Sequence, residues 1–498
     1  MRIDKNHNFF AYAYHTFVKL VLGVFVFQSA ATAASLLNPV ELFRPSVNLR
    51  LAKKPGKKFY SSLATSNQPS RKLILIAQDW TRSKDPPLSL GHASILTNLR
   101  KHQVDVVEQT WAVNAVDFSP YEVSHFILST ATNSQTDVAL GAFVWNERST
   151  QIILDDLKKN QFPGRIILGG PQVSYVKKGI ETFYPQVDVF IRGYTETALL
   201  DFMKSDVESM PSIKGVHYAK QSDVGASSIA DLDELPSPFL SGLIQPQRFI
   251  RWETQRGCPF RCAFCQHRES DISTKRRQFI LSRILQEAEW ITQNPIIQDV
   301  AVLDPIFNSG SHYLTILDEL IKGKFTGKIA FQSRAEMVKD EFLDKICKLN
   351  ETAEVVLEFG LQTTNREEQA LIDRPNNMVR VVDVLTKVRQ RQIKTEVSLI
   401  FGLPKQTISS FKQSIEFCHF HKVPIIHAFP LMLLRGTPLY EQKMQLGLIE
   451  STEIASAEIN RVQIDIPHVI SSPSFTYEEW KEMAKLAESL EKENKSAY

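Results

Sequence analysis

The sequence is poor in cysteine, with only five cysteines in 498 residues. An odd and small number excludes the disulfide framework that stabilises many secreted proteins. Cys347 and Cys418 lie in apolar helical patterns and are expected to be buried structural thiols. Internal repeats and low-complexity tracts are also lacking. A composition of 43% hydrophobic and 23% charged residues therefore indicates a folded globular chain rather than a disordered or polytopic membrane protein.

Acidic residues are scarce at the amino-terminal end. Residues 1–72 hold eleven Lys or Arg but only two acids, Asp4 and Glu41. The rest of the chain carries 47 basic and 53 acidic residues, so it is mildly acidic. Nucleic-acid-binding domains usually present a clustered basic face, and we expect no nucleic acid partner here.

The amino-terminal segment has two conflicting features. Residues 20–27 (LVLGVFVF) form an apolar run followed by Ala31-Thr32-Ala33, as in a secretory signal. Residues 44–72 are rich in Lys, Arg and Ser and contain no acid, as in a transit segment or a flexible linker. The apolar run is too short to predict a spanning helix, although it allows membrane contact. We assign residues 1–71 to a leader or basic linker.

Residues 72–205 alternate apolar runs with helix-periodic segments. Helices are expected at 90–102 and 149–159, and strands at 71–78, 104–107, 125–128, 138–144, 165–168 and 187–191. Strands separated by helices imply a parallel sheet covered on both faces. This pattern predicts a doubly wound, Rossmann-like α/β domain. Prolines and polar turns mark residues 206–247 as a connecting segment.

A second alternation occupies residues 248–450. Strands are expected at 248–256, 298–304, 328–333, 354–360, 395–401 and 425–433. Six β/α units suit a partial (β/α)6 TIM-type barrel, whose reactive groups should lie at the carboxyl ends of the strands. The remaining residues, 451–498, form a tail with a charged amphipathic helix at 477–495. The predicted fold class is therefore α/β, with a doubly wound domain ahead of a partial barrel.

The remaining three cysteines follow the first predicted strand of that barrel. Cys258, Cys262 and Cys265 have the spacing C-x3-C-x2-C. Three thiolates can bind three corners of a [4Fe–4S] cluster and leave the fourth iron open, which implies chemistry on a bound ligand. The alternative is a zinc site with His267 as the fourth ligand. The tight Cys265-x-His267 spacing disfavours it.

The spacing resembles the signature of the radical S-adenosylmethionine (SAM) superfamily, whose members cleave SAM reductively to methionine and a 5′-deoxyadenosyl radical. The resemblance implies that the three cysteines hold the cluster and that Phe264 packs against adenine. Later strand ends are also similar to the family, at 303–308, 331–336, 357–363, 397–404 and 434–439. They imply SAM contacts from Arg334 or Arg374, Glu358, Gln362 and Gly402.

The domain ahead of the barrel resembles the cobalamin-binding domain of one radical SAM group, which includes the anaerobic magnesium-protoporphyrin IX monomethyl ester cyclases. The similar segments are 87–91, 144–146, 169–171 and 188–196. They imply corrin contacts from Gly91, Gly169 and Gly170.

The chain departs from the cobalamin pattern at two places. It lacks an Asp-x-His-x-x-Gly motif, and the nearest histidine, His92, lies in a helix start. Gly193-Tyr-Thr-Glu196 stands where the group has Gly-Glu-Gly-Glu. A degenerate domain that serves as a lid or partner surface is the alternative.

The sequence therefore predicts a radical SAM enzyme with a [4Fe–4S] cluster, SAM and cobalamin as cofactors. A small organic substrate is expected, with an electron donor such as flavodoxin or ferredoxin. Methyl transfer, cyclisation and rearrangement stay open as outcomes, and a non-catalytic iron–sulfur or zinc-binding scaffold is the alternative function. Because an oxygen-sensitive cluster is hard to maintain in an oxidising compartment, we expect a cytoplasmic protein.

Overall fold

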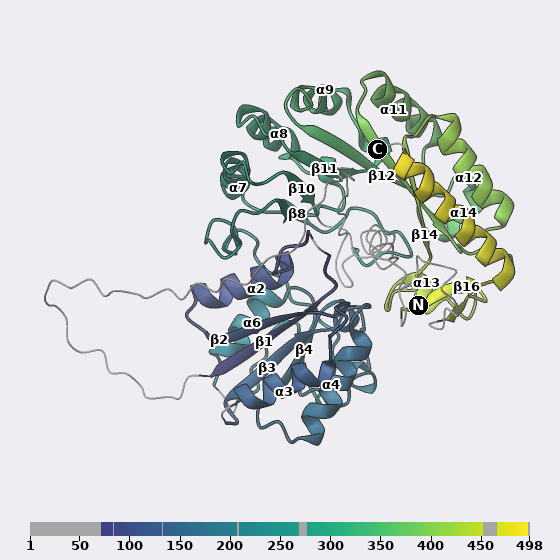
Figure 1. Cartoon of the computed structure of the whole chain (residues 1–498). Helices are drawn as coiled ribbons and strands as arrows, with labels where there is room; N and C mark the ends of the chain where they lie inside the picture. The colour runs from purple at the N-terminus through teal and green to yellow at the C-terminus, as the bar shows by residue number, and fades with distance from the viewer. Residues whose placement is uncertain are drawn as a thin grey trace, which may run out of the picture.

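The computed structural model describes residues 71–82, 84–131, 133–206, 209–267, 276–451 and 466–496. The leader predicted for residues 1–71 lies outside this range except for Arg71. Two six-stranded sheets, each accompanied by helices, make up most of the described chain (Figure 1). Within the described ranges, the helices are all too short or too polar to cross a bilayer.

The first sheet has the strand order β2-β1-β3-β4-β5-β6. Strands β1 to β5 run parallel, and β6 adds an antiparallel edge. The bounds are β1 (Lys72–Asp79), β2 (Asp105–Ala112), β3 (Thr136–Gly141), β4 (Ile166–Gly169), β5 (Val189–Ile191) and β6 (Val216–Tyr218). Strand β6 lies inside the segment that the sequence assigns to a connection between domains.

Both faces of the first sheet are apolar. On β1, Leu73 and Leu75 belong to the core shared with α2 (Leu90–Lys101) and α6 (Thr195–Lys204). Ile74 and Ile76 point the other way and pack with α3 (Pro120–Thr130) and α4 (Glu147–Lys159). Burying one such side chain stabilises the fold by about 1.5–3 kcal/mol. Figure 1 shows the two helix layers on opposite faces, which explains the continuous apolar run of this strand.

The predicted strand at residues 125–128 is wrong, because this run belongs to helix α3. Pro120 occupies the first turn, where its fixed φ favours a helix start. Val123 and Ile127 are fully buried four residues apart, which is helical spacing. The short apolar run is thus the buried face of a helix rather than a strand.

The second sheet is parallel throughout and has the order β14-β13-β12-β11-β10-β7. All six strands expected between residues 248 and 433 are present. Their bounds are β7 (Phe249–Trp252), β10 (Asp299–Val302), β11 (Lys328–Ser333), β12 (Glu354–Gln362), β13 (Lys394–Phe401) and β14 (Ile425–Pro430). Strands β8 (Gln255–Arg256) and β9 (Arg277–Gln278) form a separate antiparallel pair.

Helices cover one face of this second sheet. They are α7 (Leu281–Gln293), α8 (Tyr313–Lys322), α9 (Asp340–Leu349), α11 (Met378–Gln390) and α12 (Ile408–Phe420), which line the outer rim in Figure 1. On β12, Val355, Leu357 and Phe359 belong to the core that these helices share. The intervening Glu358 therefore lies on the opposite, inner face.

The inner face is buried but polar. Glu358 stands in register between Gln332 of β11 and Glu396 of β13, and all three side chains are buried. His427 of β14 lies 2.9 Å from Glu396, measured from Nε2 to Oε2. Buried polar groups in such a row need partners, since an unpaired group in the interior is costly.

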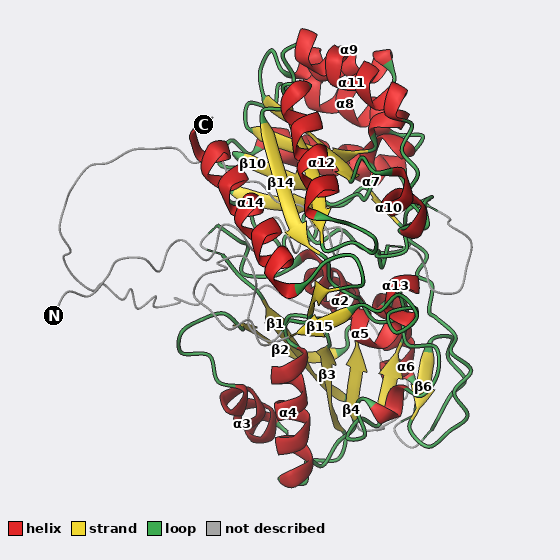
Figure 2. Cartoon of the chain, turned by 90° about the vertical axis from the view of Figure 1, so that its right-hand side faces the viewer, coloured by secondary structure: helices red, strands yellow, loops and turns green. Residues whose placement is uncertain are grey.

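The predicted carboxyl-terminal helix is present as α14 (Tyr477–Ser496) and packs along β14, as Figure 2 shows. Its Asn494 accepts a hydrogen bond from the Ile426 N–H at 3.1 Å and donates one to the Ile426 carbonyl at 2.8 Å. The helix thereby covers the last strand of the sheet, an edge that would otherwise offer unpaired backbone groups.

Candidate functional site

The three clustered cysteines lie on one loop, which follows β7 and β8. Cys262 is buried, Cys258 and Cys265 are half-buried, and all three are free thiols. Backbone contacts at Ala263 hold the loop: its N–H donates to the Ile372 carbonyl at 2.7 Å, and its carbonyl accepts from the Leu439 N–H at 3.1 Å. Segments after β12 and after β14 thus fix the same loop.

The surroundings of Cys258 and Cys265 raise the pKa of both thiols, so these side chains stay protonated unless a metal displaces the protons. Burial raises the pKa of Cys258 to about 11 and also raises that of Cys265, and the neighbouring Cys262 adds to both shifts. Two groups act against this rise in the pKa of Cys258 and Cys265. The positive charge of Arg374, whose Nη1 lies 3.4 Å from Cys262 Sγ, lowers both, and the His267 N–H, 3.3 Å from Cys265 Sγ, lowers that of Cys265. Metal binding would therefore release protons from this loop.

Side chains that would close on one metal ion are lacking in the described residues: no three His, Cys, Asp or Glu groups converge in this way. A tetrahedral zinc ion needs its sulfur ligands at about 2.3 Å. A cluster spreads its three protein ligands over three separate irons. The two kinds of site therefore need different spacings of the three sulfur atoms.

A buried carboxylate supports the strand that enters the cysteine loop. Asp304, fully buried beyond the end of β10, accepts from the Thr254 and Gln255 N–H groups at 2.8 and 3.1 Å and from the Thr254 hydroxyl at 2.5 Å. Burial raises its pKa to about 7. The sequence places Asp304 in a strand-end segment but gives it no role; its partners lie about fifty residues earlier in the chain.

The residues predicted to contact SAM lie at different distances from the carboxyl edge of the second sheet. Gln362 ends β12, whereas Glu358 lies four residues earlier, level with the buried row of the inner face. Gly402, after β13, has Val469 and Trp480 as its nearest neighbours and so faces the carboxyl-terminal elements. Phe264 is 8% exposed and packs in the core of the second sheet.

Both candidate arginines already have partners. Arg334 lies 3.2 Å from the Glu336 carboxylate and donates to the Pro375 carbonyl at 2.6 Å, with its guanidinium 3.9 Å from the Phe260 ring. Arg374 donates to Cys262 and to the Gly360 carbonyl, but its buried Nε has no partner among the described residues. Arg374 is thus the arginine that the structure brings to the cysteines.

Polar atoms without partners gather at the carboxyl ends of the second sheet. In the described part of the chain, the Ser333 hydroxyl, the Asn308 amide and Gln362 Oε1 are buried and make no hydrogen bond. They follow or end β11, β10 and β12 respectively. A polar ligand at this edge would supply the missing hydrogen bonds.

In the first sheet, chain order reverses between β1 and β3, where doubly wound sheets place their ligands. The segment after β3 closes over the end of β1: Trp145 Nε1 and Asn146 Nδ2 both donate to the Gln78 carbonyl, at 3.2 and 3.1 Å. Gly91 opens α2 nearby in sequence, and a Cβ there would meet nothing within 4 Å. This edge leaves room for a ligand at Gly91.

The other two glycines predicted to contact the corrin, Gly169 and Gly170, are packed against other parts of the chain. Gly170 has a φ of +91°, and a Cβ there would lie 2.6 Å from the Ala142 carbonyl oxygen. Gly169 ends β4 and has only ordinary contacts. His92 is buried in α2, 3.7 Å from the Glu108 carboxylate, and burial lowers its pKa. Close backbone packing therefore explains Gly170 without any ligand.

The carboxyl edges of the two sheets face one another. Three ion pairs join them: Arg251 with Asp85 at 2.9 Å, Arg256 with Glu196 at 2.8 Å and Arg435 with Glu147 at 2.8 Å. Each acid belongs to a segment that follows a strand of the first sheet, and each arginine lies in or after a strand of the second (Figure 1). The cysteine loop therefore lies beside the carboxyl edge of the first sheet.

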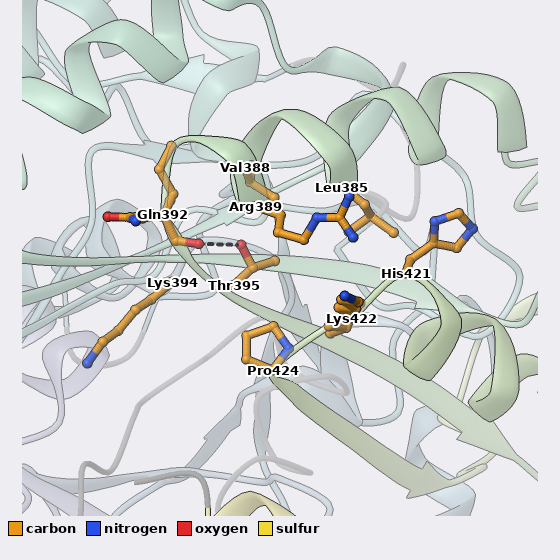
Figure 3. Close-up of a pocket in the computed structure, with 11 residues that line it drawn as sticks. Leu385, Val388, Arg389, Gln392, Lys394, Thr395, His421, Lys422 and Pro424 are labelled. Atoms are coloured by element: carbon orange, nitrogen blue, oxygen red, sulfur yellow. Dashed lines mark hydrogen bonds between the residues drawn. The ribbon is translucent and has the colours of Figure 1, made fainter.

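A pocket of about 280 Å³ lies elsewhere, at the amino-terminal ends of β13 and β14 (Figure 3). It is lined by Leu385, Val388, Arg389, Gln392, Ile393, Lys394, Thr395, His421, Lys422, Val423 and Pro424. Parallel β/α folds place catalytic groups at the opposite, carboxyl edge. The pocket is therefore not part of the candidate site.

Comparison with known proteins agrees with this geometry. Cobalamin-dependent radical SAM methyltransferase TokK from Streptomyces tokunonensis is 28% identical over 305 residues, 56% of this chain and 44% of that protein. The chain thus spans less than half the length of this curated relative.

Solved structures share the fold. The radical SAM methyltransferase TsrM from Kitasatospora setae, solved with cobalamin and a [4Fe–4S] cluster, gives a TM-score of 0.64 at 14% identity, over 84% of this chain and 91% of that one. The cobalamin-dependent SAM radical enzyme OxsB gives 0.61 at 15%, over 84% and 66%. The family model "Radical SAM superfamily" matches residues 252–418, which include the cysteine loop. This region of the chain is therefore similar to the radical SAM superfamily.

Proposed function

We propose that this chain is a radical SAM enzyme that holds a [4Fe–4S] cluster on Cys258, Cys262 and Cys265 and binds cobalamin at the first sheet. The observation that carries the proposal is the single loop that presents three thiols at the carboxyl edge of the second sheet, with Arg374 directed at one sulfur. A charged donor stabilises a thiolate. The relatives named as cobalamin-dependent methyltransferases support methyl transfer to a small organic molecule.

The finer architecture is part of the same proposal. The order β2-β1-β3-β4-β5 with helices on both faces supports a Rossmann-like, cobalamin-binding-type domain. The six parallel strands with an inner polar face support a partial (β/α)6 TIM-type barrel. We place the boundary between them in residues 206–247, although β6 of this segment extends the first sheet.

When bound, the cluster and SAM supply an electron and a radical that abstracts hydrogen, and cobalamin supplies a methyl carrier. The chain supplies binding and orientation. Asp304 holds the strand that leads into the cysteine loop, and the Ala263 backbone anchors the loop to the segments after β12 and β14. The unpaired groups of Asn308, Ser333 and Gln362 are suited to the polar parts of SAM.

Anoxic reconstitution with iron and sulfide tests the cluster. We expect bound iron and inorganic sulfide, and 5′-deoxyadenosine released from SAM after reduction with dithionite; in the cell, a flavodoxin or ferredoxin would be the donor and a reducing cytoplasm the compartment. A colourless protein without sulfide, or one that holds only zinc, would contradict the proposal.

Cobalamin is tested separately, by incubation with hydroxocobalamin, desalting and absorbance. Retained corrin supports the first-sheet site. Complete loss of corrin from a chain that still cleaves SAM would show that the first domain acts only as a lid or partner surface. Cyclisation or rearrangement then becomes the preferred outcome over methyl transfer.

A further inference from the structure

Two half-buried arginines flank the cysteine loop, and their side chains reach toward the first sheet. Arg256 precedes Cys258 by two residues, and Arg435 lies in the segment after β14 that contacts the far end of the loop. At that far end, Gln266, the residue after Cys265, donates from Nε2 to the Arg435 carbonyl at 2.9 Å. Both ends of the loop are therefore attached to arginines.

The Arg435 side chain enters a polar cluster of the first domain. Its Nη2 lies 2.8 Å from Glu147 Oε1, and its Nη1 donates to the Tyr184 hydroxyl at 3.1 Å. That hydroxyl donates to Glu147 Oε1 at 2.7 Å. The guanidinium also stacks over Phe183, 4.2 Å from the ring centre. Glu147 opens α4, directly after the segment that closes over β1.

Backbone packing next to Arg435 also holds the segment after β14 against the first domain. Gly436 has a φ of +74°, and a Cβ at this position would lie 2.1 Å from the Tyr175 carbonyl oxygen. Only glycine allows the backbone after β14 to come so close to the first domain. Arg435 therefore has little freedom to leave the Glu147 cluster.

Arg256 makes the equivalent link at the start of the loop. Its Nη2 lies 2.8 Å from Glu196 Oε1, which also accepts from the Ser94 hydroxyl at 2.9 Å. Glu196 lies in the first turn of α6 and is buried, whereas its partner Arg256 is half-buried. Despite its burial, Glu196 keeps a lowered pKa because Arg256 faces it. This is the glutamate retained from the Gly-Glu-Gly-Glu pattern.

We propose that Arg256 and Arg435 are positioning residues through which the first domain, by way of Glu196 and Glu147, sets the geometry of the cysteine loop and so the reactivity of its cluster. The inference rests on the proposed function, because it concerns that cluster. The two glutamates reach the loop through these arginines, at 2.8 Å in each pair. The two ion pairs join both ends of the loop to the first domain.

The test compares full-length, reconstituted Glu147→Gln and Glu196→Gln with wild type. Both keep side-chain size and remove charge. We expect 5′-deoxyadenosine formation to fall about tenfold, a typical coupling for such networks. The electron paramagnetic resonance spectrum of the reduced cluster with SAM should change too, along with its midpoint potential, which loss of stability alone would not move. The double variant Glu147→Gln/Arg435→Gln should lose little more than either single change.

Asp223→Asn is the matched control. It removes an acid of similar burial in the connecting segment, which pairs at 2.7 Å with buried Arg192 of the first domain. We expect unchanged spectra and rate. Tyr184→Phe is a milder variant that removes only the hydroxyl between Arg435 and Glu147; it should lower the rate about threefold and carries the test if Glu147→Gln does not fold.

The outcomes are distinct. Wild-type rates and spectra in both glutamate variants, or equal losses in Asp223→Asn, would overturn the inference while the proposed function stands. A wild-type chain that binds no cluster would overturn both.

Discussion

The two parallel sheets bury their faces differently. In the first, both faces are apolar and covered by helices, so its strands read as continuous hydrophobic runs. In the second, the outer face is equally apolar, but the inner face carries Gln332, Glu358, Glu396 and His427, all buried. A sheet that only needed stability would not place carboxylates there. From this contrast we expect the polar chemistry at the second sheet.

The sheets also differ at their carboxyl edges. The glycine turns of the first edge are partly explained by close packing, as at Gly170 against Ala142. The three cysteines of the second edge lie together on one loop, and the described part of the chain pairs none of them in a disulfide. The cluster is thus the better supported cofactor, and the following experiments probe that difference.

The largest effect is expected at the cysteine loop. Cys262→Ala removes one corner of the cluster, so iron and sulfide content and 5′-deoxyadenosine formation should fall more than about a hundredfold. Cys347→Ala, at a half-buried thiol of α9, should keep both. Iron and sulfide assays with product chromatography decide the comparison, and a Cys262→Ala protein that still cleaves SAM would refute the ligand assignment.

A second comparison uses one buried aspartate from each sheet. Asp304→Ala leaves the Thr254 and Gln255 N–H groups unsatisfied and should cost about 2–4 kcal/mol of unfolding free energy. Asp137→Ala removes the carboxylate that pairs with buried Arg71 at 3.0 Å and should cost about 3–5 kcal/mol.

The two alanine variants should differ more in their iron and sulfide content than in their unfolding free energy. Only Asp304→Ala should lower iron and sulfide content, because only Asp304 holds the strand that leads to Cys258. Urea unfolding of the apoprotein gives the stabilities, and metal analysis gives the loading. Equal iron and sulfide content in the two variants would contradict the positioning role of Asp304.

Sequence patterns could predict the strands of the second sheet because each is a buried apolar run between helix-periodic segments. They failed at residues 125–128, because a run of only four residues, His-Phe-Ile-Leu, fits a short strand as well as one turn of a helix. They identified the cysteines, since local spacing carries that signal. They could not identify Asp304, Glu147 or Glu196 as supports of the cysteine loop, because these contacts join residues far apart in the chain.

A smaller effect should distinguish a glycine needed for close packing, Gly170, from one that leaves room for a ligand, Gly91. Gly170→Ala forces a side chain into a left-handed φ against Ala142 and should destabilise the fold by about 1–3 kcal/mol, with or without cobalamin. Gly91→Ala meets open space at the start of α2, so stability should hold or rise by up to about 1 kcal/mol. If cobalamin approaches this edge, Gly91→Ala should instead weaken corrin retention, measured by absorbance after desalting. Unchanged retention would place the corrin elsewhere.

The smallest effect concerns His468 of β16 (His468–Ser471), a fully buried group outside the proposed site. Burial lowers its pKa to about 3 from 6.5. The folded state therefore keeps this imidazole neutral while the unfolded chain takes up a proton below pH 6.5, so stability is present above that pH and is lost as the pH falls. Between pH 7.5 and 5.5 the loss should be about 1.4 kcal/mol.

The difference in unfolding free energy between wild type and His468→Leu isolates this contribution, since other titrating groups cancel in it. That difference should change by the same amount over the two pH units while the iron and sulfide content of reconstituted His468→Leu matches wild type. A pH-independent difference would mean that the ring is hydrated in the folded state. A loss of cluster in this variant would mean that the polar chemistry assigned to the inner face and carboxyl edge of the second sheet extends to its carboxyl-terminal cover.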